Sequence, residues 1–431
     1  MLSQDGTNPL VQVSYFPQLI EILYDTYLEL SGHYDLIIRH VGEKKVDAVI
    51  LTAFFAENGL YLPYYFKCPT ILLSPIGPIP HWSHYFGNPE NPSYQPDTRM
   101  PFIEPMSFME RVVNTLYYGS IEGLNIQQRM MSSILSNKGL MQYDEFINMY
   151  YNMSLLLQNS HFITHNSQPK VANTVEIGGI HCKTGKPLPD DLQKFLDHAT
   201  SGAVYVSFGS AIKSSLMSEE RINIFLETFR NIKYPVIWKY DSDDIPNLPS
   251  NVMLKKWLPQ QDLLAHPNLK VFVTHGGLFS LQEALFHNTP LVGIPLGTDQ
   301  KPNLLRAQRH GYAIMLDWPT LNTTGFTDAI KRVMLDTNIQ EGMNRANQLF
   351  TDEKETPLER AVWWIEYVIR HDGAGFLRPE SMTLSFYQYH LLDVIAFLSF
   401  IIIMIFLIIF KCCICCKQIC CRKVSTKRKT E

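Results

Sequence analysis

The sequence predicts an α/β protein with two domains, followed by one helix that crosses a membrane. Short apolar runs rich in β-branched residues alternate with amphipathic segments through the second half of the chain, as in a parallel, doubly wound sheet. A less regular series of the same kind comes before it. Near the end, Leu391–Phe410 is apolar except for Asp393, and about 20 such residues form a helix that spans a hydrocarbon core.

Length and charge agree with this organisation. The 431 residues are enough for two domains of ordinary size with additional segments. The chain has 37 basic and 41 acidic residues, and this near-neutral balance gives no support to nucleic-acid binding. We therefore expect a compact protein with a mostly apolar core and no nucleic-acid partner.

The first domain is predicted from three short strands. Val46–Leu51, Thr70–Ser74 and Phe162–Thr164 are apolar or β-branched runs of strand length. The segment Pro75–Pro105 is rich in proline and aromatic residues, and its prolines favour an ordered loop over a helix or a central strand.

The second domain carries the regular alternation. Strands are predicted at Ala203–Phe208, Val236–Tyr240, Val252–Trp257, Val271–Thr274 and Leu291–Pro295. Helices are predicted at Ser218–Ile232, at Leu281–His287 and from about Pro302. A further helix begins at Thr356-Pro357, with the threonine as its cap, and ends at Gly373. In a doubly wound sheet, ligands bind at the carboxyl ends of the strands.

The residues at those strand ends favour an anionic ligand. His275-Gly276-Gly277 follows the run that ends at Thr274, and its glycines let a ligand approach the backbone closely. The next helix offers free N–H groups and the positive end of its dipole, which suit a diphosphate. Taken singly, Trp257 fits a core aromatic residue and Glu283 a solvated helix residue, but their joint spacing favours a ligand site.

One stretch of the second domain resembles the donor-binding signature of the UDP-glycosyltransferase superfamily. It runs from Trp257-Leu-Pro-Gln260 through Thr274-His275-Gly276-Gly277 and Glu283 to Pro295-Leu-Gly-Thr-Asp299-Gln300. The resemblance is strongest to the animal UDP-glucuronosyltransferases. It implies a GT-B type fold with two Rossmann-like domains, of which the first is truncated here, plus the C-terminal transmembrane helix. The implied parts are a truncated acceptor-binding domain at 1–165, a UDP-sugar donor-binding domain at 170–350, a helical segment at 351–390, the transmembrane helix at 391–410 and a cytosolic tail rich in cysteine and basic residues at 411–431.

The resemblance also implies a role for each polar residue of the signature. Trp257 stacks on uracil and Gln260 bonds its polar edge. Thr274, His275 and Ser280 contact the diphosphate, and Gly276 lets the diphosphate approach the backbone closely. Glu283 accepts both ribose hydroxyls, and Asp299 and Gln300 hold the hexose hydroxyls. Two departures, Phe279 before Ser280 and Gly297-Thr298 in place of the usual Phe-Gly, predict differences in the detail of the phosphate and sugar pockets.

The catalytic residues stay unassigned at this point. In the family a histidine near the first strand of the acceptor domain deprotonates the acceptor, and an acidic partner supports the imidazolium. Met1–Gly6 has no apolar signal-peptide core and no matching histidine segment is predicted before Val46, so about one hundred residues of the usual length are expected to be absent. The position of the acidic partner is Thr52, and Glu57 is a weak substitute.

Four histidines of the first part, His33, His40, His81 and His84, are available imidazoles, but each is expected to be structural. Without the usual base, we expect little or no transfer by this chain even if it binds the donor. A spliced or incomplete gene is the simplest cause of such a shortened sequence.

Three functions follow from the resemblance and the residues. The first is inverting transfer of a glycosyl group, with glucuronate favoured and glucose the alternative, from a UDP-sugar to small lipophilic acceptors. The second is a catalytically impaired isoform that binds the donor or associates with full-length relatives as a homo- or hetero-oligomer. The third is a membrane-anchored scaffold, which the intact signature disfavours. UDP-sugar would be a co-substrate, and no metal or other cofactor is expected.

The flanks of the apolar run predict its orientation. Phe386, Tyr387 and Tyr389 precede it as an aromatic belt, and basic residues follow it from Lys411 onward, so the tail is predicted to be cytosolic and the body lumenal. Lys427–Glu431 resembles an endoplasmic reticulum retrieval signal, although a plain stop-transfer flank fits equally well. Asn152 and Asn322 begin glycosylation triplets.

Six of the eight cysteines crowd the predicted tail: Cys412, Cys413, Cys415, Cys416, Cys420 and Cys421. Their place beside the membrane favours reversible palmitoylation over zinc binding, because no histidines accompany them. Only Cys68 and Cys182 remain for the lumenal part, which does not imply a disulfide framework.

Overall fold

A computed structural model of the chain describes residues 16–54, 56–98, 100–124, 126–210, 214–242 and 244–427. Residues up to Leu377 form one compact unit, and those from Arg378 onward form a second. The Met1–Gly6 segment and Arg428–Glu431, which includes most of the predicted retrieval signal, lie outside the described residues.

The first sheet has four parallel strands in the order β1-β2-β3-β4. These strands are β1 (Val49–Thr52), β2 (Thr70–Ser74), β3 (Leu155–Gln158) and β4 (Thr174–Glu176). Leu72 and Leu156 point to one face of this sheet and Ile71 and Leu155 to the other, and both faces are buried. Apolar residues on both sides of each strand are what a parallel sheet covered by helices requires.

One face of the first sheet packs against helices that come before and within it. These helices are α2 (Phe16–Ser31), α3 (Tyr34–Val41), α4 (Ala56–Gly59), α5 (Tyr61–Phe66), α6 (Pro80–Tyr85), α8 (Ile126–Asn137) and α9 (Tyr143–Tyr151). Two more helices of this part of the chain are α7 (Phe108–Leu124) and α10 (Phe162–His165), and α10 packs against helices of the second sheet. The opposite face is covered by α18 (Pro357–Arg370), whose Ala361 and Val368 pack on Ile71, Leu155 and Leu157. The chain therefore returns to the first sheet after completing the second.

The second sheet has six parallel strands in the order β10-β9-β8-β5-β6-β7. They are β5 (Ala203–Ser207), β6 (Val236–Lys239), β7 (Val252–Lys255), β8 (Leu269–Thr274), β9 (Leu291–Gly293) and β10 (Ala313–Met315). The chain builds outward from β5 to β7 and then resumes at β8 on the other side of β5. The topological switch point, where doubly wound sheets bind ligands, lies between the carboxyl ends of β5 and β8.

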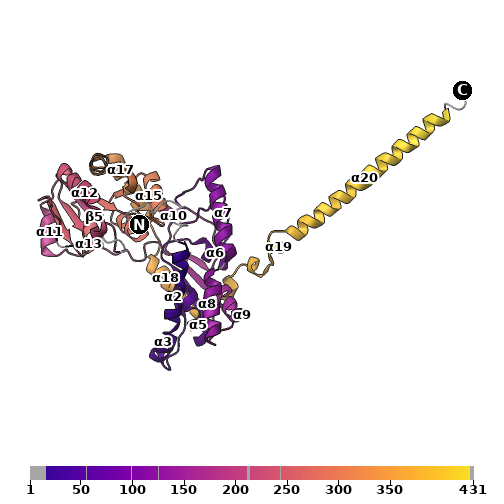
Figure 1. The fold of residues 1–431 in the computed structure, drawn as a ribbon, viewed down its shortest axis with the longest axis horizontal. Helices are drawn as coiled ribbons and strands as arrows, with labels where there is room; N and C mark the ends of the chain where they lie inside the picture. The colour runs from indigo at the N-terminus through magenta and orange to yellow at the C-terminus, as the bar shows by residue number, and fades with distance from the viewer. Residues whose placement is uncertain are drawn as a thin grey trace. The chain divides into compact units, whose positions relative to one another are not determined.

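Helices cover both faces of the second sheet. They are α11 (Asp190–Asp197), α12 (Glu219–Ile232), α13 (Gln260–Leu264), α14 (Leu278–Phe286), α15 (Gln300–Arg309), α16 (Thr323–Leu335) and α17 (Thr337–Thr351). On one face, Phe225 and Phe229 of α12 pack against Trp238, and Phe326 of α16 packs against both phenylalanines. Figure 1 labels α12, α17 and β5 in this part of the chain. The short turns η1 (Ser214–Leu216) and η2 (Trp318–Thr320) complete it.

Most elements of the second domain confirm the sequence prediction. The predicted helix at Ser218–Ile232 is α12 with Ser218 as its cap, and the helix predicted from Thr356-Pro357 is α18 with a capping box between Thr356 and Glu359. The helix predicted at Leu281–His287 begins earlier, at Leu278, because Gly277 ends the turn before it.

Two predictions for the first domain are wrong. Phe162–Thr164 is the helix α10 and not a strand, because His161 caps it: its Nδ1 accepts from the Ile163 N–H at 3.2 Å. The third strand is instead Leu155–Gln158. Pro75–Pro105 contains the helix α6, which begins at Pro80, a position where proline is tolerated.

Two helices, α2 and α3, come before β1, and α3 carries His40. Within the residues from 16 onward, no strand comes before β1.

The second unit contains η4 (Glu380–Thr383), α19 (Phe386–Tyr389) and α20 (Leu392–Lys427), and η3 (Gly375–Leu377) comes just before it. Figure 1 draws α20 as one continuous helix. Its segment Leu392–Lys417 has a mean hydropathy of 3.0 and is not buried, so it is long and apolar enough to cross a membrane. It extends beyond the predicted span because the helix does not end at Phe410.

Candidate functional site

The signature residues lie at the switch point of the second sheet. Thr274 is the last residue of β8 and is fully buried. Gly276 has a positive φ of 85°, and a Cβ at this position would come within 2.5 Å of the Leu304 side chain. Glycine is therefore required in the turn that leads from β8 to Gly277, the N-cap of α14.

The His275 ring is held between two glycines. A Cβ added to Gly209, after β5, would lie 3.0 Å from the ring, and one added to Gly277 would lie 2.6 Å from it. Burial, with the nearby Lys239 ammonium, lowers the pKa of His275 to about 4, so the ring is neutral at pH 7. Its Nδ1 is buried and has no hydrogen-bond partner among the described residues, which leaves it for a ligand.

Gln260 and Glu283 form one hydrogen-bonded group on α13 and α14. The Gln260 Nε2 donates to Glu283 Oε2 at 2.5 Å and to Ser280 Oγ at 3.0 Å. The Tyr205 hydroxyl, from β5, donates to Gln260 Oε1 at 3.0 Å. Burial raises the pKa of Glu283, and the bonds from Gln260 and Gln261 oppose that rise. The amide thus fixes the carboxylate that the resemblance assigns to ribose.

The linker between the two sheets also contacts α13 and α14 next to Gln260 and Glu283. His181 Nε2 lies 3.1 Å from the Phe279 carbonyl oxygen and 3.8 Å from Glu283 Oε1. Gln261 accepts from the Lys183 N–H at 2.7 Å and donates to the His181 carbonyl at 3.1 Å. Burial lowers the pKa of His181, so it acts here as a neutral donor.

Trp257 lies at the open side of this group. Its side chain is 77% exposed, which is unusual for tryptophan and leaves the indole face available for stacking. Lys239, at the end of β6, places its ammonium 5.2 Å from the centre of the Trp257 ring and donates to the Gly209 carbonyl at 3.0 Å. The core-residue alternative for Trp257 is therefore wrong.

Asp299 and Gln300 lie at the start of α15. Gln300 Oε1 accepts from the Leu296 and Gly297 N–H groups at 2.7 and 3.1 Å and so fixes the turn. Asp299 accepts from the Thr298 hydroxyl at 3.0 Å and from Asn303 at 2.8 Å, and burial raises its pKa. Asn303 also donates to the Gly276 carbonyl at 3.1 Å. This amide joins the predicted sugar residues to the predicted phosphate loop.

The structure therefore brings the nine predicted residues into two linked groups around one switch point. Three neighbours were not predicted: Tyr205, Lys239 and His181. Lys239 had a signal, since it is a cation at the end of a predicted strand. Tyr205 and His181 had no sequence signal, because their contacts join segments more than 50 residues apart, as the Tyr205–Gln260 bond does.

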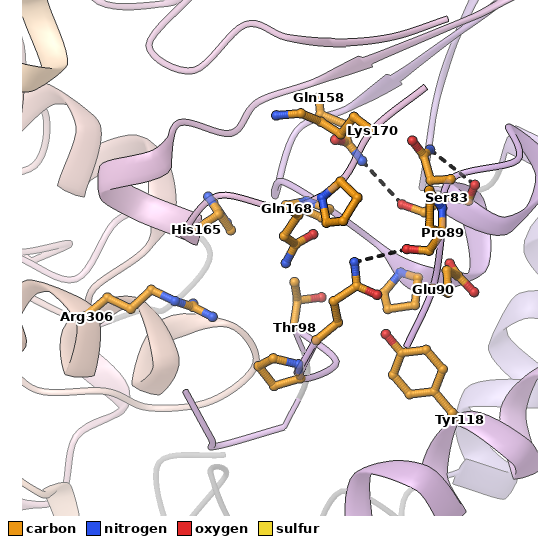
Figure 2. A pocket seen from close by; sticks show the side chains of 16 residues that line it. Ser83, Pro89, Glu90, Thr98, Tyr118, Gln158, His165, Gln168, Lys170 and Arg306 are labelled. Carbon is orange, nitrogen blue, oxygen red and sulfur yellow. Dashed lines mark hydrogen bonds between the residues drawn. The ribbon is translucent and has the colours of Figure 1, made fainter. Parts of the chain in front are cut away.

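A pocket lies where the first domain meets α15 (Figure 2). Ser83 of α6 and Gln158 of β3 line it, with the Gln158 amide donating to Ser83 Oγ at 3.4 Å. Figure 2 shows Tyr118 and Arg306 on opposite sides of it. Arg306 belongs to α15, whose first residues are those of the predicted sugar site, about 10 Å away along the helix axis.

A cluster of polar bonds joins the first domain to α15 beside this pocket. Arg306 is 4% exposed and donates to both Glu104 carboxylate oxygens at 3.3 Å. Asn166 donates to the same carboxylate at 2.7 Å and accepts from Arg309 at 2.8 Å, and Arg309 also donates to the Glu104 carbonyl.

The first domain also shows where the doubtful catalytic positions lie. Thr52 is exposed at the carboxyl end of β1. Glu57 is 1% exposed and accepts from the Tyr150 hydroxyl at 2.9 Å and from Tyr27 at 3.3 Å. His81 Nε2 lies 2.7 Å from the Tyr150 hydroxyl and 4.0 Å from Glu57. Burial raises the pKa of Glu57, and its position in the core disfavours direct contact with an acceptor.

Metal ligands do not gather in the part of the chain that the structure describes: no group of three or more His, Cys, Asp or Glu side chains there could hold a metal ion. Cys68 and Cys182 are both free thiols.

Solved structures share this pair of parallel sheets. The glycotransferase of kitacinnamycin matches 80% of this chain and 82% of its own, with a TM-score of 0.56 and 18% identity. CalG4, the calicheamicin glycosyltransferase, matches 84% of each chain with a TM-score of 0.54 and 17% identity. The fold is that of a GT-B glycosyltransferase.

The sequence comparison identifies the family. The profile described as UDP-glucoronosyl and UDP-glucosyl transferase matches residues 21–429, and the chain belongs to this family of UDP-sugar glycosyltransferases. UDP-glucosyltransferase 2 of Dactylopius coccus is 36% identical over 383 residues, covering 86% of this chain and 73% of the relative. UDP-glucuronosyltransferase 2B7 of Homo sapiens is 33% identical over 387 residues, covering 88% and 72%.

Proposed function

We propose that the chain binds UDP-glucose at the switch point between β5 and β8 and transfers the glucose, with inversion, to small lipophilic acceptors such as phenols. The observation that carries this proposal is the gathering of two hydrogen-bonded groups at this switch point: Gln260 with Glu283, and Asp299 with Asn303, which also binds the Gly276 carbonyl beside His275. We assign the Glu283 carboxylate to ribose, the unpartnered His275 imidazole to phosphate and the Asp299 carboxylate to hexose.

Each part of the donor has a matching group. Uracil stacks on the exposed Trp257 ring, where Lys239 supplies a positive charge next to the phosphates. The diphosphate meets the N–H groups at the start of α14 and the Nδ1 of His275. Glu283 accepts the ribose hydroxyls while Gln260 holds its other side. Gln260 thus positions the carboxylate, whereas the resemblance alone gave it the uracil edge.

Two observations favour glucose over glucuronate, which the resemblance favoured. Asp299 is a carboxylate, and the neighbouring Lys301 ammonium lies 3.6 Å from Asp317, which neutralises it. Hydroxyl groups suit this environment better than the additional carboxylate of glucuronate. The relative from Dactylopius coccus is named a glucosyltransferase. Glucuronate is the second candidate, because relatives such as UDP-glucuronosyltransferase 2B1 of Rattus norvegicus are 37% identical over 350 residues, covering 80% of this chain and 65% of the relative.

The pocket beside Arg306 is proposed to hold the acceptor. It belongs mainly to the first domain and lies about 10 Å along α15 from Asp299, a distance that a small aromatic molecule can bridge. Tyr118 offers an aromatic face and Gln158 a polar group for a hydroxyl.

In the reaction, the acceptor oxygen forms a bond to the anomeric carbon while the bond from that carbon to the UDP oxygen breaks. UDP leaves with the electron pair, and the N–H groups of α14 with Lys239 stabilise its charge. The acceptor proton needs a base, which typically contributes about 10²–10⁴-fold. Thr52 cannot take a proton at the position that the resemblance assigns to the acidic partner, so an acceptor that is already ionised should react best.

The test compares acceptors and donors on the whole chain in microsomes. Labelled UDP-glucose or UDP-glucuronate is offered with 4-nitrophenol, which ionises near neutral pH, or with an aliphatic alcohol of similar size. We expect an inverted glucoside of nitrophenol, with a rate that exceeds that for the alcohol by at least tenfold. Asp299→Asn should abolish the product. A product formed mainly from UDP-glucuronate would overturn the glucose assignment, and the absence of any product with either donor would overturn the transferase proposal for this chain.

We also propose that α20 anchors the protein in the endoplasmic reticulum membrane, with the body lumenal and the tail cytosolic. The basic residues Lys411 and Lys417 at one end and the aromatic residues of α19 at the other support this orientation. Asn152 and Asn322 are exposed, as glycosylation in the lumen requires. Protease added to intact microsomes should remove only the tail, and a glycosidase should lower the mass of the protected body. Digestion of the body would reverse the topology.

A further inference from the structure

The cysteines at the end of α20 are not used by the donor site or by the acceptor pocket. Cys412, Cys413, Cys415 and Cys416 follow the apolar segment directly, and all four are exposed free thiols. Ile414 lies among them and is 41% exposed. Between Lys411 and Lys417 the helix surface is therefore a mixture of thiols and one apolar group.

The length of α20 places these thiols at a membrane surface. From Leu392 to Phe410 the helix rises by about 28 Å at 1.5 Å per residue, which matches a hydrocarbon core of roughly 30 Å. Lys411 is the first charged residue after Asp393. The four thiols then lie within about 9 Å beyond the apolar segment, at the level of the lipid headgroups.

Helical geometry excludes a disulfide between two of these four cysteines within the helix. A helix turns by about 100° per residue, so Cys412 and Cys413 point in different directions, and residues four apart have Cβ atoms about 5–6 Å apart. A disulfide needs Cβ atoms about 3.5–4.5 Å apart. The four thiols also form no metal-binding group among the described side chains.

We propose that the cysteines 412, 413, 415 and 416 are S-acylated by long-chain fatty acids. The acyl donor is a fatty acyl-CoA thioester from the cytosol. The cysteine sulfur attacks the thioester carbonyl carbon and forms a new carbon–sulfur bond, while the bond from that carbon to the sulfur of CoA breaks. The cysteine proton goes to the departing CoA thiolate, so atoms and charge balance.

Geometry explains why this site suits an acyl chain. A chain attached at the headgroup level can fold back beside α20 and lie among the lipid tails, so the modification lengthens the apolar surface of the anchor. The proposal rests on the cytosolic orientation of the tail given above, because acyl-CoA is found on that side.

The experiment uses acyl exchange on the full chain in cell membranes. Free thiols are blocked with N-ethylmaleimide, thioesters are cleaved with neutral hydroxylamine, and the released thiols are coupled to a maleimide-polyethylene glycol that adds a fixed mass. We expect hydroxylamine-dependent mass steps in the parent chain. The combined variant Cys412→Ser, Cys413→Ser, Cys415→Ser and Cys416→Ser should lose at least three quarters of the shifted material, whereas the control Cys68→Ser should keep it.

Two outcomes would contradict the proposal. One is a parent chain without hydroxylamine-dependent steps. The other is a serine variant that shifts as the parent does, which would place acylation elsewhere.

Labelling of intact microsomes with a membrane-impermeant maleimide separates the two ways in which the proposal can fail. If the tail thiols react only after detergent, the tail is lumenal, and the orientation fails together with the proposal. If they react fully without hydroxylamine, the orientation stands and acylation is refuted. UDP binding is unaffected in both cases.

Discussion

Replacing Glu283 by glutamine should weaken UDP binding by about 100-fold. The carboxylate is proposed to accept two ribose hydroxyls, and hydrogen bonds to a charged group contribute about 1.5–3 kcal/mol each. Gln260 Nε2 donates to Glu283 Oε2 at 2.5 Å, so the side-chain amide of the Glu283→Gln variant must turn its oxygen toward Gln260. Its NH₂ group then faces the ribose, where one hydroxyl loses its acceptor. The expected loss is about 3 kcal/mol, which is roughly a hundredfold in Kd.

Calorimetric titration of UDP into the detergent-solubilised chain measures this change. Glu341→Gln on α17 is the matched control, since this glutamate is exposed and away from the site. Burial raises the pKa of Glu283, so UDP affinity should fall as the pH is lowered toward that pKa, and the Glu283→Gln variant should lack this dependence. A change in Kd below about threefold would refute the ribose assignment.

Three further changes follow from the contacts. Lys239→Met should weaken UDP binding about tenfold in the same titration, because one cation near the phosphates is lost. Glu104→Ala should lower the free energy of unfolding in urea by about 3 kcal/mol, because it leaves the buried Arg306 charge unpaired. Glu57→Gln should change the pH dependence of Tm. The folded pKa of Glu57 is raised, so the parent loses stability as pH rises from about 4.5 through that pKa, and the variant should not.

Each of these changes has a matched comparison. Lys233→Met removes an exposed lysine beyond α12 and should leave the Kd unchanged. Glu341→Ala controls for Glu104, and Glu29→Gln, an exposed glutamate of α2, controls for Glu57. Equal effects in variant and control would mean that the contact concerned contributes nothing specific.

The second domain could be predicted from sequence because its local signals agree with each other. Ser218 caps α12, and each strand is an apolar run of the expected length. The resemblance then named nine donor-site residues, and they lie around one switch point in the structure. Residue-by-residue roles stay predictions until a ligand is bound.

The first domain was harder because local signals conflict there. Leu155–Gln158 is buried on both faces, so it shows no alternation and follows α9 without a proline or glycine between them. Phe162–Thr164 has strand propensity, but the cap from His161 makes it helical. The contacts of Tyr205 and His181 join segments that are distant in the sequence, which a single sequence does not reveal.

The structure of the full chain with UDP bound, by crystallography or electron cryo-microscopy in detergent, tests the central claim most directly. The account predicts uracil on the Trp257 ring, ribose hydroxyls at Glu283 and the diphosphate against His275 and the start of α14. UDP bound at another place, for example in the pocket beside Arg306, or ribose turned away from Glu283, would contradict it.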